Sequence, residues 1–112
     1  MCLFCRIANK EIPSKMVLED EHVYAFHDIN PGAPVHVLVV PKRHVQGLGQ
    51  VGSEDEAMLG KLLLASRRVA EQLGIVDSGF RTVINNGPNA GQSVFHLHVH
   101  VIGGRALAWP PG

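Results

Sequence analysis

The sequence predicts an α+β domain built around an antiparallel sheet, because of the order of its expected elements and its length. These elements follow as helix, hairpin, strand, long helix and hairpin, so strands adjacent in the chain are expected to pair antiparallel. The 112 residues suffice for one hydrophobic core but not for two. We therefore expect a single domain over residues 1–112.

A short helix and a hairpin are expected at the start of the chain. Residues 2–10 predict the helix, and Pro13 follows it; the apolar side of this helix consists of Phe4, Ile7 and Ala8. Residues 16–18 and 23–26 are apolar runs that predict two strands. The acidic segment 19–21 between them is expected to form the polar turn of the hairpin.

Three further strands complete the expected sheet. A turn-rich loop over residues 30–34 leads into residues 35–40, which are apolar on both faces as in a central strand. Residues 80–85 predict another strand, and residues 96–102 predict the last one. A polar, glycine-rich loop over residues 85–93 leads into this last strand.

A long helix is expected over residues 53–73. Ser53, followed three residues later by Glu56, matches a capping box, and Gly74 is a natural C-terminal stop. One apolar stripe at helical spacing is expected to be buried, and it consists of Leu59, Leu62, Leu63, Val69, Ala70 and Leu73.

Three histidines, His96, His98 and His100, occupy alternate positions of the last expected strand. Alternate side chains of a strand lie on one face, about 7 Å apart at a rise of about 3.3 Å per residue, so one small charged group can reach two of them. The aliphatic residues between the histidines would point into the core. Imidazole is costly to bury and titrates near neutrality, so this row indicates a functional site.

The middle histidine, His98, is the natural nucleophile of this row. A neutral imidazole has one nitrogen with a lone pair and one nitrogen with an N–H. For nucleophilic attack by the first nitrogen, a neighbouring group must accept a hydrogen bond from the second. The preceding loop supplies Asn85, Gln92, Ser93 and glycine amides, which suit an anionic phosphate oxygen. This combination indicates attack on phosphorus with a covalent nucleotidyl- or phosphoryl-histidine.

The Cys2-x-x-Cys5 pair permits a metal site. Two such cysteines suit zinc, and His44 and His96 would complete a Cys2His2 set. The spacing differs from that of zinc fingers, and two alternatives remain: small buried hydrophobes or a redox pair.

Composition excludes several other classes of protein. Ten Lys and Arg residues balance ten Asp and Glu residues. The sequence therefore lacks the excess of basic residues that is typical of proteins that bind nucleic acids or membrane surfaces. No apolar run approaches the ~18 residues of a membrane span, and the start lacks a signal-peptide pattern. We therefore expect a cytoplasmic protein with reduced cysteines.

The sequence resembles the histidine triad (HIT) superfamily, whose signature is His-φ-His-φ-His-φ-φ with φ apolar. Several other segments resemble this family in the same order and cover nearly the whole chain. They are Glu11–Ser14, Phe26–Ile29, His36–His44, Gly91–Ser93 and the terminal Trp109–Gly112. The segment Gly103–Arg105 and the terminal Trp-Pro-Pro-Gly resemble the Hint branch, the histidine triad nucleotide-binding proteins.

This resemblance implies a fold, an assembly and an activity. The implied fold is a homodimer in which two sheets join into one ten-stranded sheet, with the tail around Trp109 approaching the active site of the partner. The implied activity is hydrolysis of purine nucleoside phosphoramidates, such as adenosine 5′-monophosphoramidate, to the nucleoside monophosphate and an amine.

The resemblance also implies roles for individual residues. His98 would be the nucleophile, His36 would orient the histidine row, and Asp28 would bind the ribose hydroxyls. The phosphate would be held by His100 and by the loop residues Asn85, Gly91, Gln92 and Ser93. The purine slot would be lined by Phe4, Ile7, Phe26, His27, Ile29 and Leu38.

The paired cysteines resemble a zinc-binding bacterial subgroup, in which Cys2, Cys5, His44 and His96 match the ligands. Such a zinc would be structural, and the chemistry would need no cofactor. Two other functions share these residues: a dinucleoside polyphosphate hydrolase or nucleotidyl transferase, and a nucleotide-binding module with vestigial activity.

Overall fold

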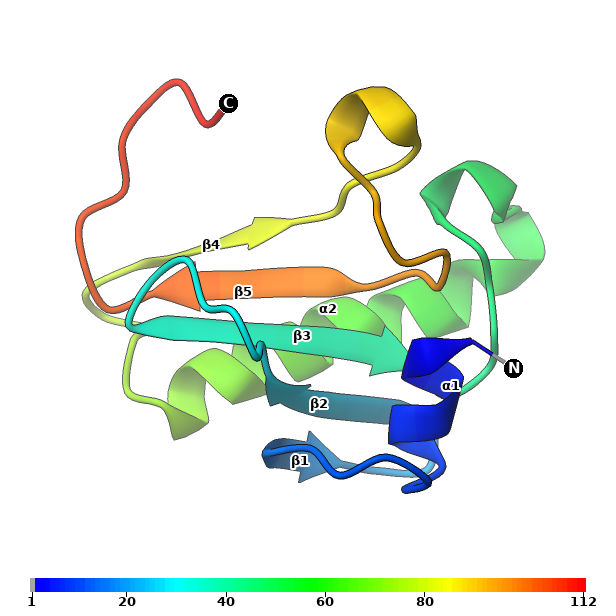
Figure 1. Cartoon of the computed structure of the whole chain (residues 1–112). Helices are drawn as coiled ribbons and strands as arrows, with labels where there is room; N and C mark the ends of the chain where they lie inside the picture. The colour runs from blue at the N-terminus through cyan, green and yellow to red at the C-terminus, as the bar shows by residue number, and fades with distance from the viewer. Residues whose placement is uncertain (1) are drawn as a thin grey trace.

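The computed structural model describes residues 2–112, which form three layers around a five-stranded antiparallel sheet (Figure 1). The sheet order is β1-β2-β3-β5-β4, so β3 is central and β1 and β4 are edges. The bounds are α1 Leu3–Ala8, β1 Met16–Glu19, β2 Val23–His27, β3 Val35–Pro41, α2 Glu56–Gln72, β4 Phe80–Val83 and β5 Val99–Gly103. Three short 3-10 helices are η1 Leu48–Gln50, η2 Ser53–Asp55 and η3 Pro88–Ala90. The predicted α+β class and antiparallel sheet are confirmed.

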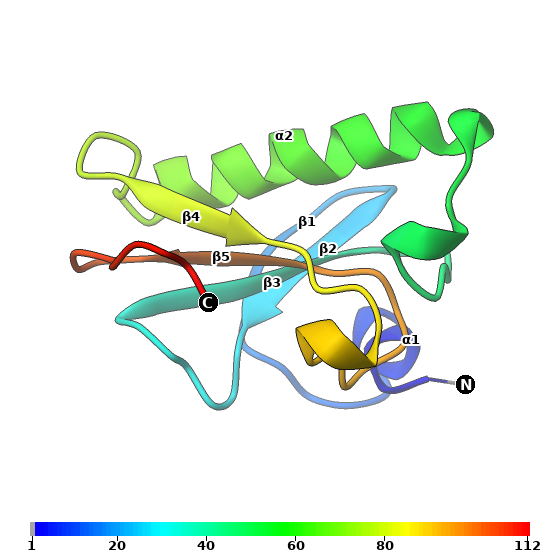
Figure 2. The same cartoon turned by 90° about the horizontal axis from the view of Figure 1, so that it is seen from above.

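Alternation along the strands divides the core between the two faces of the sheet. Figure 2 shows α2 along one face and α1 on the other. The cluster on the α2 face includes Val37 and Val39 of β3 and Val99 and Val101 of β5, all fully buried. The smaller cluster on the α1 face includes Tyr24, Phe26, Leu38 and Val40. β2 and β3 therefore bury both of their faces, whereas β5 is fully buried only on the face toward α2.

The long helix α2 begins three residues later than predicted. Residues Ser53–Asp55 form η2, and the backbone N–H of Gly52 donates to Oδ2 of Asp55 at 3.0 Å. The predicted capping box of Ser53 and Glu56 is therefore wrong, because Asp55 serves the turn before the helix. Gly74 follows the helix with φ +73°, as predicted for a C-terminal stop.

One member of the predicted buried stripe of α2 lies on the wrong face. Leu62, Val69 and Ala70 are buried, whereas Leu63 is 54% exposed. Buried positions recur at Leu62, Ala65, Ser66 and Val69, and Leu63 lies about 100° from the centre of that face. Leu63 and Leu64 are therefore exposed apolar residues of α2, and Leu63 shares a cavity with Ile84, which follows β4.

The last strand, β5, begins at Val99 rather than at His96. Its pairing with β3 ends at Val39 opposite Val99, because β3 ends at Pro41, which has no N–H to donate. Leu97 instead donates its backbone N–H to the carbonyl of Val45 at 2.7 Å. Alternation nevertheless persists, since Leu97 joins the core on the α2 face.

The preceding strand, β4, is also shorter than predicted and ends at Val83. Among the helices of residues 2–112, none has the length and apolar character needed to cross a membrane.

Candidate functional site

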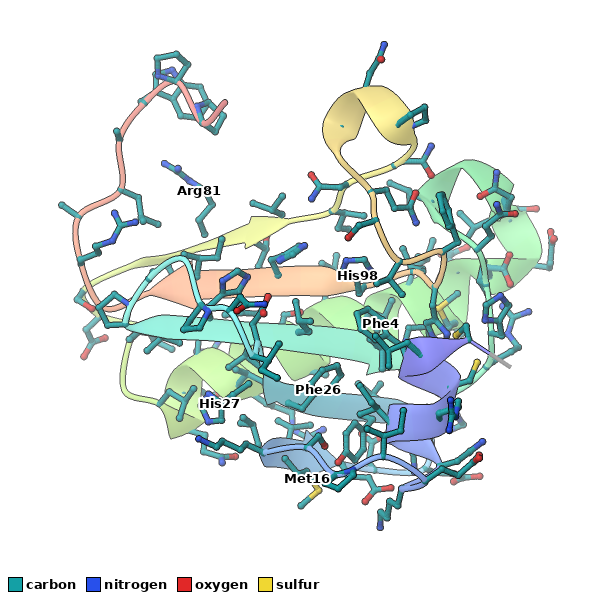
Figure 3. The ribbon with its side chains drawn as sticks, in the orientation of Figure 1. Phe4, Met16, Phe26, His27, Arg81 and His98 are labelled. Atoms are coloured by element: carbon teal, nitrogen blue, oxygen red, sulfur yellow. The ribbon has the colours of Figure 1, made fainter. Side chains whose placement is uncertain are left out.

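His98 is an oriented imidazole with one free lone pair. Its Nδ1 donates to the carbonyl oxygen of His96 at 2.7 Å, which leaves Nε2 of the neutral ring as an acceptor. The Phe4 ring meets the imidazole edge-on at a centroid distance of 5.0 Å, and Figure 3 shows the two side chains close together. Burial lowers the pKa of His98, which favours the neutral form. These properties are those of a nitrogen nucleophile.

A chain of hydrogen bonds fixes the protons of His36 and His100. The backbone N–H of Gly32 donates to Nδ1 of His36 at 2.9 Å, so the neutral His36 ring carries its proton on Nε2. That Nε2 lies 2.8 Å from Nδ1 of His100 and 3.4 Å from Oδ2 of Asp28. Because Nδ1 of His100 accepts a hydrogen bond from Nε2–H of His36, the neutral His100 ring carries its own proton on Nε2.

Nε2 of His100 is, across residues 2–112, the one buried side-chain polar atom without a hydrogen-bond partner. An unpaired buried donor is costly unless a ligand completes it. Burial, together with the charges of His98 and His36, lowers the pKa of His100 to about 4. The ring centroids of His98 and His100 are 5.0 Å apart, so the ring with the free lone pair lies next to the ring with the unpartnered N–H.

The apolar residues predicted for the purine slot fall into two groups. Phe4 and Ile7 of α1 pack with Phe26 and Leu38 in one buried cluster on the side of the sheet that carries the histidines. The rings of Phe4 and Phe26 are 5.5 Å apart and edge-on. Ile29, in the loop after β2, is 92% exposed.

His27, in contrast, does not join this cluster. It has the strand parity of Val23 and Ala25, which face α2, and its side chain is exposed. The prediction that His27 lines the same slot as Phe26 therefore conflicts with strand alternation.

In the loop before the histidines, the side chain of Gln92 is hydrogen-bonded within the protein. The side-chain amide of Gln92 donates to the carbonyls of Gln46 and Val94, and its oxygen accepts from the Gly87 amide. The side-chain amide of Gln92 therefore uses its N–H groups to hold the loop in shape.

The other loop residues remain accessible. Asn85 is half-buried, Ser93 and Gly91 are exposed, and Gly91 has φ +77°, a conformation that favours glycine.

Cys2, Cys5, His44 and His96 converge at the N-terminus of α1. Their Sγ and Nδ1 atoms form a nearly regular tetrahedron whose six edges are 3.1–3.5 Å. A zinc ion with two thiolate and two imidazole ligands gives edges of about 3.3–3.8 Å, from bond lengths of about 2.0–2.3 Å. The predicted ligand set is therefore brought together in a geometry that could hold a metal ion.

Hydrogen bonds outside the tetrahedron suit metal binding as well. Nε2 of His96 donates to the carbonyl oxygen of Pro41 at 2.8 Å, which leaves the Nδ1 lone pair directed at the cysteines. The backbone N–H of Cys5 donates to Sγ of Cys2 at 3.2 Å, which holds this sulfur beside the other three donor atoms. The donor set fits zinc, and it lies apart from Nε2 of His98.

Two residues of the site left no signal in the sequence. Gly32 acts through its backbone amide, and Val45 pairs with Leu97 through its carbonyl, so neither contribution depends on a side chain. The turn-rich composition of residues 30–34 predicts a loop but not the direction of its amides.

Comparisons with known proteins identify close relatives. A family model described as the HIT domain matches residues 9–107. An uncharacterized HIT-like protein of Synechocystis is 53% identical over 110 residues, which is 98% of this chain and 96% of the relative. The crystal structure of a HIT family hydrolase from Legionella pneumophila aligns over 100% of both chains with a TM-score of 0.98 and 42% identity. A histidine triad nucleotide-binding protein from Candida albicans aligns over 98% of this chain and 83% of its own, with a TM-score of 0.82 and 32% identity.

Replacing His100 is expected to make the stability of the protein less sensitive to acid. Its folded pKa of about 4 lies below the unperturbed 6.5, so the unfolded chain takes up a proton that the folded chain refuses. Between about pH 7.5 and pH 5 this difference destabilises the native protein by on the order of 2 kcal/mol. The free energy of unfolding, measured with urea at both pH values, should therefore fall less between pH 7.5 and pH 5 in His100→Asn than in the wild type. Exposed His22→Asn is the control, and an unchanged loss in His100→Asn would contradict this assignment.

Proposed function

This chain belongs to the HIT domain family, and on that premise we propose that it is a purine nucleoside phosphoramidase. The proposed reaction cleaves the P–N bond of adenosine 5′-monophosphoramidate and related compounds to give AMP and an amine. The observation that carries the proposal is that the ring of His98, with a free lone pair on Nε2, lies next to the ring of His100, with an unpartnered N–H. A nucleophile beside a buried donor is what transfer of an anionic phosphorus group requires.

In the proposed mechanism, Nε2 of His98 attacks the α-phosphorus. A phosphorus–Nε2 bond forms while the P–N bond of the substrate breaks, and the amine leaves with a proton from solvent. The carbonyl oxygen of His96 accepts a hydrogen bond from Nδ1–H of His98, with 2.7 Å between the two heavy atoms, and so stabilises the positive charge that develops on the ring. Water then hydrolyses the phosphorus–Nε2 bond, which releases AMP and restores the lone pair.

Residues around the two histidines are proposed to bind the remaining parts of the nucleotide. Nε2–H of His100 would donate to a phosphate oxygen, assisted by the accessible Asn85 and Ser93. Asp28 would accept hydrogen bonds from the ribose hydroxyls. Its carboxylate is 19% exposed, and Oδ2 lies 3.4 Å from Nε2 of His36, next to the proposed phosphate site. The cluster of Phe4, Ile7, Phe26 and Leu38 would hold the purine, with the exposed Ile29 of the loop after β2 as a further contact.

We propose that Cys2, Cys5, His44 and His96 bind a structural zinc ion. When bound, zinc would link Cys2 and Cys5 at the start of α1 to His44, which precedes α2, and to His96, which precedes β5. His96 would thereby be held in place, and its carbonyl is the group that orients His98. No step of the proposed reaction uses the metal.

We also propose a homodimer formed through the β4 edge. β4 has a partner on one side only, and α2 places Leu63 and Leu64, 54% and 65% exposed, on its apolar surface. A cavity of about 140 Å³ is lined by Leu48, Leu59, Leu62, Leu63, Ile84 and Val99. Pairing of two β4 edges would cover unpaired backbone groups and give the ten-stranded sheet. Arg81 of β4 donates a hydrogen bond to the carbonyl of Ala108, in the C-terminal tail. The exposed Trp109, the next residue of this tail, would then lie near the partner.

His98→Asn is expected to lower phosphoramidate turnover at least a thousandfold while AMP still binds. Asparagine keeps a polar side chain of similar size but has no nitrogen lone pair for attack. Steady-state kinetics with an adenosine phosphoramidate, and calorimetric titration with AMP, measure the two effects, with His22→Asn as the control. Retained turnover in His98→Asn would exclude His98 as the nucleophile, and preference of the wild type for diadenosine polyphosphates would indicate the related hydrolase.

The protein purified under reducing conditions is expected to contain one zinc ion per chain. Cys5→Ser should lose this zinc and unfold at a lower temperature, because an incomplete ligand set binds zinc poorly. Elemental analysis and thermal unfolding of both proteins test this, and His22→Asn should keep the metal. Equal zinc content in wild type and Cys5→Ser would refute the assignment.

Leu63→Glu is expected to convert the dimer into a monomer, because it buries a charge at the proposed interface. Met16→Glu is the matched control, since Met16 is 52% exposed on β1 at the opposite edge of the sheet. Light scattering after size-exclusion chromatography should give half the wild-type mass for the first variant and the full mass for the second. A dimeric Leu63→Glu, or a monomeric wild type, would contradict the proposed interface.

A further inference from the structure

Arg105 touches none of the groups proposed to bind substrate, yet it contacts the loop that supports them. Its Nη2 donates to the carbonyl oxygen of Gly32 at 2.9 Å, and its Nη1 donates to the carbonyl of Ala106 at 3.0 Å. Arg105 follows the end of β5, whereas Gly32 lies between β2 and β3, 73 residues earlier in the chain. The arginine therefore joins two loops at one end of the sheet through main-chain carbonyls.

Gly32 extends this link to the histidines. Its carbonyl is held by Arg105, and its own N–H donates to Nδ1 of His36 at 2.9 Å. The two groups belong to consecutive peptide units that flank a single α-carbon. Glycine loses more conformational freedom than any other residue when it is ordered, so the direction of this amide depends on its hydrogen bonds. Releasing the carbonyl would let the amide turn away from His36.

The Gly32 amide on Nδ1 of His36, together with Oδ2 of Asp28 at 3.4 Å from Nε2, favours the tautomer that also places the proton of His100 on Nε2. With the amide on Nδ1, His36 carries its proton on Nε2 and donates it to Nδ1 of His100 at 2.8 Å. His100 then presents N–H at Nε2, the buried atom without a partner. Without that amide, His36 can instead carry its proton on Nδ1 and accept from His100. His100 would then present a lone pair, which repels an anionic oxygen.

We infer that Arg105 is a positioning residue: by holding the carbonyl of Gly32 it keeps the Gly32 amide on His36 and the proton of His100 on Nε2. The backbone of Gly104, the residue before Arg105, packs closely against Pro34 in the loop that contains Gly32. A Cβ atom built at Gly104, whose φ is +88°, would lie only 2.9 Å from Cβ of Pro34. The turn that carries Arg105 thus lies directly against the loop of Gly32. The effect of Arg105 on turnover rests on the proposed function, whereas its effect on the histidine tautomers does not.

Nitrogen-15 NMR of the histidine rings tests this inference directly, because long-range proton–nitrogen correlations distinguish the two tautomers. The samples are wild type, Arg105→Ala, Arg105→Lys and the control Arg67→Ala, which removes an exposed arginine of α2 that pairs with Glu71. Wild type and Arg67→Ala should show His36 and His100 protonated on Nε2. Arg105→Ala should show mixed tautomers at both rings, and Arg105→Lys should restore part of the Nε2–H population, because lysine can still donate to the carbonyl.

Kinetics and thermal unfolding separate positioning from a general loss of structure. In Arg105→Ala, kcat for an adenosine phosphoramidate should fall about tenfold, as for one lost hydrogen bond, with the unfolding midpoint within a few degrees of wild type. A single Nε2–H tautomer at both rings of Arg105→Ala would overturn the inference. Mixed tautomers with unchanged kcat would support the role of Arg105 as a positioning residue and would contradict the proposed role of the His100 N–H in turnover. If the wild type shows no turnover, the proposed function fails, and the NMR spectra alone decide the role of Arg105.

Discussion

The antiparallel pairing of β3 with β5 is the constraint on which the candidate site depends. In this register His36 lies opposite Ile102 and Leu38 lies opposite His100, so the two histidines are diagonal neighbours on one face. The same pairing places valines of both strands against α2 on the other face. A slip of one residue would exchange the two faces of a strand, burying the histidines in the core and exposing the valines. The hydrophobic core therefore sets the register that brings His36 within 2.8 Å of His100.

His96 connects the two polar parts of the molecule. Its Nδ1 belongs to the proposed zinc site, its Nε2 donates to the carbonyl of Pro41, and its own carbonyl accepts from Nδ1 of His98. The residue is fully buried, and burial lowers its pKa, so it is held as a neutral ring. The three histidines of the row thus differ in environment: His96 faces the cysteines, His98 faces Phe4, and His100 faces His36.

Side-chain patterns in the sequence predicted what depends on side chains. Alternation of apolar and histidine residues predicted which face carries the site, and Cys-x-x-Cys with two histidines predicted a cluster that the structure brings together. Features that depend on the backbone were not predictable from these patterns. The start of β5 is set by Pro41 on the neighbouring strand, and the role of Gln92 is set by three main-chain groups that contact its amide. The orientation of the Gly32 amide, which fixes the proton of His36, has no sequence signature either.

The proposed chemistry depends on a covalent bond between phosphorus and Nε2 of His98. The most direct measurement is rapid acid-free quenching of the wild-type protein during turnover of an adenosine phosphoramidate, followed by intact-mass and peptide mass spectrometry. We predict a transient mass increase of one adenylyl group, which fragmentation of the peptide that contains His98 and His100 assigns to His98 and which is absent from His98→Asn. Turnover without any such adduct, or an adduct on His100 or His36, would contradict the mechanism.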